Sequence, residues 1–561
     1  MFRSSSSRSL ALLAVCAAPS VAQTEYYRVD DQGPSGQLGF SIATGYDLNN
    51  DGVQDFLAGR PQPSSNNDIA LLYSGATGEL IQLFLQGGIG GSFGASVAMT
   101  GDLNGDGISE LLIGAPGAPL GQGKGAAYLY DGVSFGLLTQ LSPAAAGEEF
   151  GQVAPVGDVN GNGSLEFAVA DPREDIGGKV NAGVVRIYEF NPATNTASVV
   201  RQYEGDLAFD ELGWALADGR DVNQDGLADL LVGAPVGDVP IPGGAVLADA
   251  GYARLYSGTG ATLGTFQGTS NGGKLATSVE LVDDYDGDGL LDVAVGEPEF
   301  DLFPFIDSGR VQLFSSASQL SLGTVNGAAS DARLGVSMGR VDDTNGDGVG
   351  ELLVGLQGAA QDGGVQALSG ADLSLLFSLP GGAPMSFYGD VVRGTGDLNG
   401  DGAPEFLVAE PMASPTGEVH VFSSEELSLF QDFGASGGSQ HVISGTAGGT
   451  QSLKIQLGAG AQGKLFVLLG SLQTSGLSIG ALDIPLALDG YFTFVLANPG
   501  QVFAPSNGLL AAGGTASTSV SVPAGTTIAT TLTLYHAVVA FDLGTMLVTD
   551  VTNNVPLTLR P

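Results

Sequence analysis

The nine residues DLNGDGISE, at positions 102–110, carry the pattern that decides the fold, D-x-[DN]-x-[DN]-G-x-x-[DE]. The pattern occurs seven times, beginning at residues 47, 102, 158, 221, 284, 343 and 397, so that successive copies start 54 to 63 residues apart. A single copy is weak evidence, because Asx-Gly turns also form for purely structural reasons. Seven copies at a regular spacing predict an array of structural repeats.

The residue types in each copy suit calcium. Ca²⁺ takes about six to eight oxygen ligands, and a tight loop can supply side chains at positions 1, 3 and 5, a backbone carbonyl at position 7 and a closing carboxylate at position 9. The glycine at position 6 permits the sharp turn. We therefore predict about one Ca²⁺ per repeat. The predicted side-chain ligands, copy by copy, are Asp47, Asn49, Asp51, Asp55, Asp102, Asn104, Asp106, Glu110, Asp158, Asn160, Asn162, Glu166, Asp221, Asn223, Asp225, Asp229, Asp284, Asp286, Asp288, Asp292, Asp343, Asn345, Asp347, Glu351, Asp397, Asn399, Asp401 and Glu405.

The third copy differs from the other six. Its fifth position is Asn162, so that Asp158 and Glu166 are its only carboxylates, whereas every other copy has at least three. We expect the third loop to bind calcium most weakly.

The residues around each copy predict that the loop joins two β-strands. An EF-hand loop places its closing acid at position 12 and continues into a helix. Here the acid at position 9 is followed by short β-type runs such as 111–113, and a strand that opens with an aromatic residue or Leu and a Gly, as in FGASVA (93–98), precedes the loop. The second strand ends in a Gly-Ala-Pro-like turn, and a third strand (AAYLYDG, 126–132) and usually a fourth follow. Four short strands with intervening turns are typical of one propeller blade.

These signatures resemble the FG-GAP repeat of integrin α-subunits and of many exported bacterial proteins. The resemblance covers roughly residues 24–432 and implies an all-β fold with a seven-bladed β-propeller. Two repeats depart from the pattern, because the fifth has Leu275-Ala276 in place of Phe-Gly and the sixth has Leu356-Gln357 in place of Ala-Pro. Closure of the ring is open at this point, since either 26–29 or 427–430 could supply the last strand of the seventh blade.

The N-terminus predicts export. Two arginines precede an apolar run (10–18) and a small-residue site ending at Ala22, which is typical of a cleaved signal peptide over residues 1–22. The only cysteine, Cys16, would leave with this signal; lipid attachment there is an alternative, although Val15 fits it poorly. We therefore expect a secreted or cell-surface protein whose propeller spans 23–432.

Composition limits the partners. The chain has 60 acidic and 19 basic residues and a formal net charge of −41, which disfavours nucleic acid and leaves cations as the natural counter-charge. Residues 433–561 carry few charges and alternate apolar residues with Thr and Ser, which predicts a separate, sandwich-like all-β domain. The apolar stretch 528–548 shows the same alternation with Thr, so we expect no transmembrane segment.

Ligand recognition is expected at the propeller end opposite the metal loops. In an antiparallel four-stranded blade the connections between strands one and two lie at one end and those between strands two and three at the other. The latter vary most in blades three to five, where the candidates are 173–175, 236–250 and 299–307. The last loop contains Phe300, Phe303 and Phe305, and the alternative is that these rings pack beneath it.

The predicted function is a non-enzymatic, calcium-binding adhesion or ligand-binding module for an extracellular protein or glycan. A polysaccharide hydrolase or lyase on the same scaffold is one alternative, and converging acids in the central channel would favour it. A structural component of the cell envelope is the other. The three histidines are scattered, so we expect neither His-based catalysis nor a histidine metal site, and His420 is expected only to fill a strand position.

Overall fold

Strands are the only regular elements in the part of the chain that the structure describes. This computed structural model of the 561-residue chain describes residues 23–426, except 31–35, 63–67, 86–90, 118–123, 144–148, 346, 359–361, 382–383, 400–402 and 414–416, and beyond them the backbone of strands between 428 and 560. The predicted signal peptide, 1–22, lies outside the described residues. Within them, no helix is long and apolar enough to cross a bilayer.

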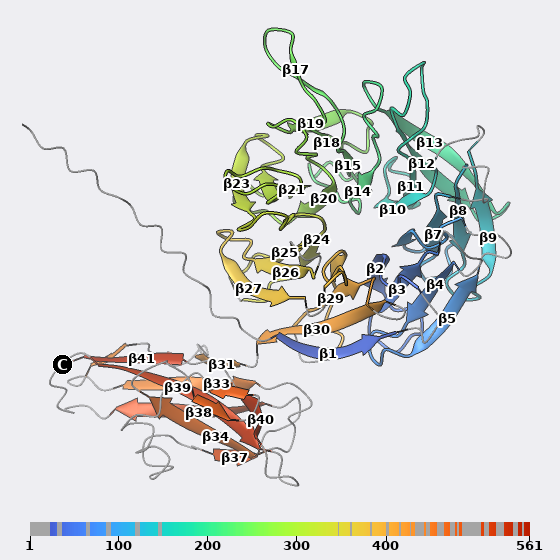
Figure 1. The fold of residues 1–561 in the computed structure, drawn as a ribbon. Coiled ribbons are helices and arrows are strands. Elements are labelled where there is room, and N and C mark those ends of the chain that lie inside the picture. Colours follow the sequence, from blue (N-terminus) through green and yellow to red (C-terminus); the bar gives the residue numbers. More distant parts are fainter. Residues whose placement is uncertain are drawn as a thin grey trace, which may run out of the picture.

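Seven four-stranded antiparallel sheets form a ring (Figure 1). Blades one to three contain β2 (Ser41–Tyr46), β3 (Asp55–Arg60), β4 (Ile69–Tyr73) and β5 (Leu80–Leu85); β6 (Ser96–Met99), β7 (Leu111–Ala115), β8 (Ala126–Tyr130) and β9 (Leu137–Leu141); and β10 (Gln152–Gly157), β11 (Glu166–Asp171), β12 (Val184–Asn191) and β13 (Thr196–Glu204). Blades four to six contain β14 (Ala215–Leu216), β15 (Leu230–Ala234), β18 (Tyr252–Tyr256) and β19 (Thr262–Gln267); β20 (Ser278–Val282), β21 (Asp292–Glu297), β22 (Arg310–Phe314) and β23 (Ser321–Asn326); and β24 (Met338–Val341), β25 (Glu351–Leu356), β26 (Gly364–Leu368) and β27 (Leu375–Pro380). The predicted seven-bladed propeller is therefore confirmed.

The N-terminal strand closes the ring. Blade seven has the order β1 (Gln23–Val29), β30 (Glu418–Glu426), β29 (Glu405–Glu410) and β28 (Val392–Gly394), with β1 antiparallel to β30. In Figure 1 the blue β1 lies beside the orange β30. The hydroxyl of Tyr27 on β1 donates a hydrogen bond of 2.6 Å to the Gly75 carbonyl of blade one, so the closing strand also holds its neighbour. Of the two candidates for closure, the N-terminal segment is the one used.

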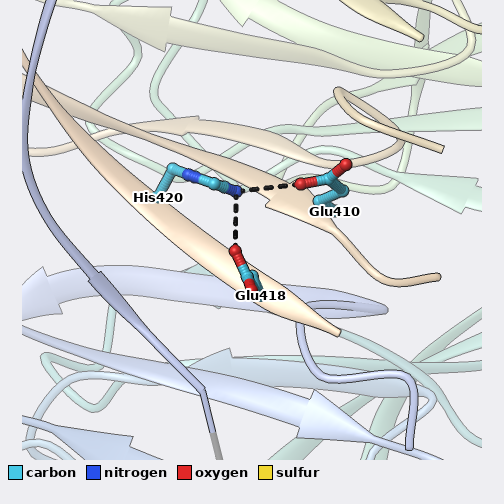
Figure 2. A group of neighbouring side chains, drawn as sticks. All are labelled: Glu410, Glu418 and His420. Carbon is cyan, nitrogen blue, oxygen red and sulfur yellow. Dashed lines mark hydrogen bonds and ion pairs between the residues drawn. The ribbon is translucent and has the colours of Figure 1, made fainter. Parts of the chain in front are cut away.

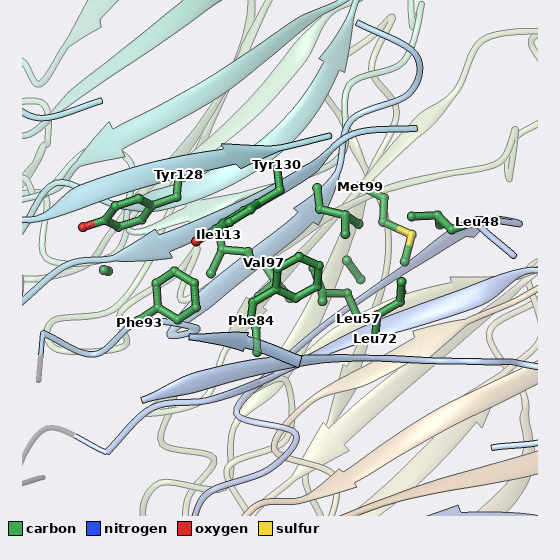
Figure 3. Close-up of a cluster of buried hydrophobic side chains, with 14 of the residues drawn as sticks. Leu48, Leu57, Leu72, Phe84, Phe93, Val97, Met99, Ile113, Tyr128 and Tyr130 are labelled. Carbon is green, nitrogen blue, oxygen red and sulfur yellow. The ribbon is translucent and has the colours of Figure 1, made fainter. Parts of the chain in front are cut away.

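The core lies between adjacent blades. The second strand of each blade is almost wholly buried, because the neighbouring blades cover both of its faces. Between blades one and two, Leu57 and Leu72 pack with Val97 and Ile113, and Phe93 lies 5.5 Å from Tyr128, ring centre to ring centre (Figure 3). The aromatic residue of the FG signature is thus an inter-blade core residue.

The two glycines of the repeat meet across four of the seven blade interfaces. A Cβ on Gly114, in the Gly-Ala-Pro turn of blade two, would lie 1.8 Å from the carbonyl oxygen of Gly151 in the FG signature of blade three. Gly151 itself has a φ of +144°. In the fifth repeat the FG glycine is Ala276, which still adopts a φ of +72°, so the departure keeps the backbone conformation at a cost in strain.

Beyond the propeller the chain forms further strands. They are β31 (Ser428–Gln431), β32 (Val442–Ser444), β33 (Gly449–Gln456), β34 (Leu465–Ser471), β35 (Leu477–Ile479), β36 (Leu482–Ile484), β37 (Asn507–Leu509), β38 (Thr515–Val522), β39 (Leu532–Phe541), β40 (Val548–Val551) and β41 (Val555–Arg560). They pair in the orders β31-β33-β38, β32-β41-β39-β34-β37 with β40 on β39, and β35-β36. The sandwich-like domain over 433–561 stays a prediction.

Candidate metal sites

Each predicted metal loop connects the first and second strands of its blade. The closing acid at position 9 is the first residue of the second strand in five blades and directly precedes it in the other two. All seven closing acids are buried, and each accepts a hydrogen bond of 2.5 to 2.9 Å from the backbone N–H of position 2. They are Asp55, Glu110, Glu166, Asp229, Asp292, Glu351 and Glu405. The burial of the second strand therefore carries one carboxylate per blade into the protein.

Backbone N–H groups shape the rest of the loop. In loop two the Asp102 carboxylate accepts hydrogen bonds from the N–H groups of Asp106 (3.1 Å) and Gly107 (2.8 Å). The same contact from position 6 to position 1 recurs at 2.7 to 2.9 Å in loops one and three to six. Gly107 has a φ of +92°, which is why position 6 is glycine.

Carboxylate oxygens converge within 4.8 Å of one another in three of the loops. These groups are Asp102, Asp106 and Glu110 in loop two, Asp284, Asp286 and Asp292 in loop five, and Asp343, Asp347 and Glu351 in loop six. Loops one and four fold alike, but among their described atoms the three carboxylates do not converge this closely. In loop seven Asp397, Asn399 and Glu405 are described, whereas Asp401 lies outside the described residues.

The closing carboxylates of the loops are buried and lie close to other acids, so a bound cation would stabilise their ionised form. Burial, with repulsion from acids in or beside the same loop, raises the pKa of Glu110, Glu166 and Glu351 to about 7 and that of Asp55 and Asp292 to about 6. The Oε1 atom of Glu351 is buried and accepts no hydrogen bond from the described residues. An all-oxygen donor set with buried, mutually repelling carboxylates fits Ca²⁺.

Two acids that sequence reasoning missed lie beside the loops. Glu189 lies on β12, the third strand of blade three, opposite the closing acid Glu166, and its Oε1 accepts a 3.0 Å hydrogen bond from the side-chain amide of Asn162. Asp131 holds the equivalent place in blade two, 3.1 Å from the Asn104 amide. Aligning the seven repeats at this position would have found them, because the equivalent residue is serine in the other five blades. The third loop therefore has a third carboxylate beside it, supplied by the third strand of the same blade.

The loops at the opposite end serve several roles. Arg173 bridges Glu149 (2.6 Å) and Glu211 (3.3 Å), and Glu174 pairs with Arg186 at 2.5 Å, so these charges are part of the structure. The 236–250 segment contains a hairpin of β16 (Val239–Pro240) and β17 (Val246–Leu247).

The 299–307 loop divides its aromatic residues between packing and exposure. The Phe300 ring packs against the guanidinium of Arg310, with 3.7 Å between Cζ of Arg310 and the ring centre. For this ring, packing within the structure, the alternative to ligand recognition, is what the structure shows. Phe303 is 97% exposed and Ile306 is 64% exposed. Within this loop Phe300 packs against the blade, whereas Phe303 is exposed to solvent.

The central channel contains charged side chains of both signs. A cavity of about 470 Å³ is lined by Asp218, Glu280 and three arginines, Arg220, Arg340 and Arg393. The carboxylates of Asp218 and Glu280 accept no hydrogen bond from the described residues, and burial raises the pKa of Glu280 to about 7. Acids do enter the channel, but together with arginines.

Comparison with known proteins places this architecture. Models of the FG-GAP repeat match residues 93–130, 212–256, 276–314 and 394–422. Integrin alpha-V of Gallus gallus is 31% identical over 210 residues, covering 35% of this chain and 20% of the integrin, and integrin alpha-4 of Xenopus laevis is 29% identical over 212 residues, covering 36% and 20%. The chain spans about a fifth of the length of these curated relatives.

Two solved structures overlap with the chain more loosely. The Dos1 propeller is 11% identical, and the match covers 72% of this chain and 95% of that one. Rhamnogalacturonan lyase PL11 of Bacillus licheniformis is 13% identical, and the match covers 71% of this chain and 75% of that one. Both have a TM-score of 0.41, which is too low to support an argument. The sheets and the loop pattern define the class, a seven-bladed β-propeller of repeated loop-bearing blades. Within this class the chain carries segments that match the FG-GAP repeat, and its propeller resembles the N-terminal propeller of integrin α-subunits.

Proposed function

We propose that this chain is an extracellular ligand-binding module that is braced by calcium and recognises a protein or glycan. Calcium ions, about one per blade, would neutralise the carboxylates of the loops between first and second strands. Recognition would fall to the loops at the other end. The signal-like sequence at 1–22 and the likeness to integrins support an extracellular or cell-surface location.

The observation that carries the proposal is the exposed apolar tip of the 299–307 loop. Phe303 and Ile306 are exposed, while the same loop is fastened by Phe300 against Arg310 and by Asp307, which lies 3.3 Å from the Arg333 guanidinium. Aromatic side chains held on a rigid base are favoured anchors for protein and sugar partners. A loop that needed only to cover its blade would have no use for an exposed phenylalanine at its tip.

A binding screen tests this proposal. The full chain is applied to protein and glycan arrays with and without calcium, and every hit is repeated with Phe303→Ser and with Leu320→Ser. Leu320 is a matched control, because it is also exposed and apolar but lies in a turn at the metal-loop end. We expect hits that need calcium and Phe303 but not Leu320. Hits that depend equally on both residues would indicate general stickiness and contradict the proposal.

The pair of acids in the channel favours a second candidate, a polysaccharide hydrolase or lyase. Two carboxylates that line one cavity, one of them with a pKa of about 7, are the groups that acid–base cleavage of a sugar chain uses. The test is release of sugar fragments from acidic and neutral polysaccharides by the wild type and by Glu280→Gln. Turnover that Glu280→Gln abolishes would establish the enzyme, whereas its absence from both proteins would favour the binding module.

A further inference from the structure

A cluster of three glutamates and a histidine lies in blade seven, away from the calcium-type loops. Glu410 ends β29 and stands directly opposite Glu418, the first residue of β30. His420 follows two residues later on β30, so that its side chain is on the same face of the sheet as Glu418. The imidazole does occupy a strand position, as expected from the sequence, but it faces carboxylates (Figure 2).

The imidazole presents one nitrogen to two carboxylates. Nε2 of His420 lies 3.1 Å from Oε2 of Glu410 and 3.6 Å from Oε2 of Glu418. The side chains are largely buried, with exposures of 8% for His420, 12% for Glu410 and 22% for Glu418. A nitrogen and two carboxylates that meet in this way require a positive charge between them, either a proton or a metal ion.

The other ring nitrogen is held by the strand that closes the propeller. Nδ1 of His420 lies 3.2 Å from Oε1 of Glu25 on β1. If Nδ1 carries the proton and donates a hydrogen bond to Glu25, the lone pair of Nε2 points at the two other glutamates. Metal-binding histidines usually have such a carboxylate on the second nitrogen, because it fixes the tautomer and the ring orientation.

We propose that Glu410, Glu418 and His420 form a binding site for a divalent first-row transition ion of the Zn²⁺ type. Glu25 would orient the imidazole. The donor set of one imidazole nitrogen and carboxylate oxygens suits such an ion, whereas calcium takes oxygen ligands.

Distances and charge agree with this assignment. Metal bonds of about 2.0–2.2 Å in tetrahedral geometry place neighbouring ligand atoms about 3.3–3.5 Å apart, and the two separations from Nε2, 3.1 and 3.6 Å, bracket that value. Oε2 of Glu418 is also 3.1 Å from Nη1 of Arg28, and Nε of Arg28 is 3.8 Å from Glu25. Three glutamates and Arg28 sum to a charge of −2, which one divalent ion neutralises.

The site would join three strands of the closing blade. Its ligands come from β29 and β30, and the residue that orients the imidazole comes from β1. A bound ion would therefore link the N-terminal strand to a blade almost 400 residues away in sequence. Glu410 and Glu418 flank the connection between the second and third strands of the blade, at the end opposite the calcium-type loops, and the zinc site does not depend on the function proposed above.

Zinc titration of the full chain, with calcium at saturating millimolar concentration, tests the proposal. Calorimetry is expected to find one zinc site, which His420→Gln and Glu410→Gln abolish and which Glu25→Gln weakens by roughly 10- to 100-fold. Cobalt(II) should give the intense visible absorption of a nitrogen-containing tetrahedral site in the wild type and lose it in His420→Gln. Calcium binding, measured on each variant, verifies that the propeller is folded.

The matched control is His536→Gln, which removes a histidine on β39 outside the propeller and should leave zinc binding unchanged. Zinc binding that is equally strong in His420→Gln would overturn the proposal, and so would a folded, calcium-loaded wild type that binds no zinc. In either case a proton, and not a metal, would hold the cluster together.

Discussion

The two ends of the propeller are built on the same strands but follow different rules. At the metal-loop end every blade repeats the same contacts, from the buried closing acid to the N–H of position 2. At the other end no two of the long loops in blades three to five are alike, since one is fastened by ion pairs, one forms a hairpin and one exposes Phe303. Uniform chemistry at one end and variety at the other are what a scaffold needs when one end is braced and the other recognises a ligand.

Removing calcium should have the largest effect, and only on the propeller. At a calcium concentration 100-fold above the dissociation constant, each occupied site adds about 2.7 kcal/mol of stability by mass action. Seven such sites together would rival the about 5–15 kcal/mol that stabilises an ordinary domain. Scanning calorimetry of the full chain should therefore show one transition that falls steeply in temperature on chelation and one, from 433–561, that does not move. If neither transition temperature changed on chelation, calcium would not stabilise the metal-loop end, which would contradict the account.

The benefit from calcium should depend on pH. In the metal-free protein Glu110, Glu166 and Glu351 have pKa values near 7, above their ordinary unfolded value of about 4.3. The folded state then binds more protons than the unfolded state across this window, so the metal-free propeller loses stability as pH rises from about 4 to 7. Calcium requires the ionised carboxylates, so the melting-temperature difference between calcium-loaded and calcium-free protein should widen from pH 5 to pH 7.5. A constant difference would contradict the assignment of these acids as ligands.

Loop three offers a finer test within the metal-loop end. If Glu189 supplies the missing carboxylate, Glu189→Gln should weaken one calcium site about tenfold or more and leave the other sites unchanged. Asn162→Asp should strengthen the same site by restoring the standard pattern. Glu204→Gln, at an exposed glutamate on β13, is the control for a change in net charge. Equal effects of the two glutamate variants would show that Glu189 acts only through the overall charge.

Shortening the 299–307 loop should affect stability least. Replacing these residues with a Gly-Ser turn removes the ion pairs Lys274–Glu299 and Arg333–Asp307, each worth about 1 kcal/mol or less at the surface. The melting temperature should change little, while affinity for a ligand found on the arrays should fall strongly. Asp225→Ala should do the opposite, lowering the melting temperature and weakening binding only as far as folding suffers. The reverse outcome would mean that the ligand end has been assigned to the wrong side.

Much of the fold could be predicted because the repeat specifies its own register. Each loop marks the end of one strand and the start of the next, and the FG and Gly-Ala-Pro glycines mark where neighbouring blades touch, as Gly114 and Gly151 do. Closure could not be predicted, because 26–29 and 427–430 are equally good short strands. Only the pairing of β1 with β30 distinguishes them.

The grouping of acids in the loops could be predicted because these residues are close in sequence, whereas the contacts between residues distant in sequence could not. The loop acids lie within nine residues of one another, whereas Glu189 lies on β12, 27 residues from its partner Asn162 in loop three. Glu25 is 395 residues from His420, and nothing in either local sequence points to the other. The exposure of Phe303 was equally unreadable, because an identical residue three positions earlier packs beneath Arg310.

The number of calcium ions bound per folded chain tests the central claim most directly. Calorimetric titration of the calcium-free, full-length protein near pH 7.5 should give close to seven sites, with dissociation constants of roughly 10⁻⁴ to 10⁻³ M, as is typical of extracellular calcium modules. Each site should be lost singly when its own closing acid is replaced. A stoichiometry of two or fewer would contradict the account, because it would mean that the seven buried closing acids are a structural feature of the turn and not metal ligands.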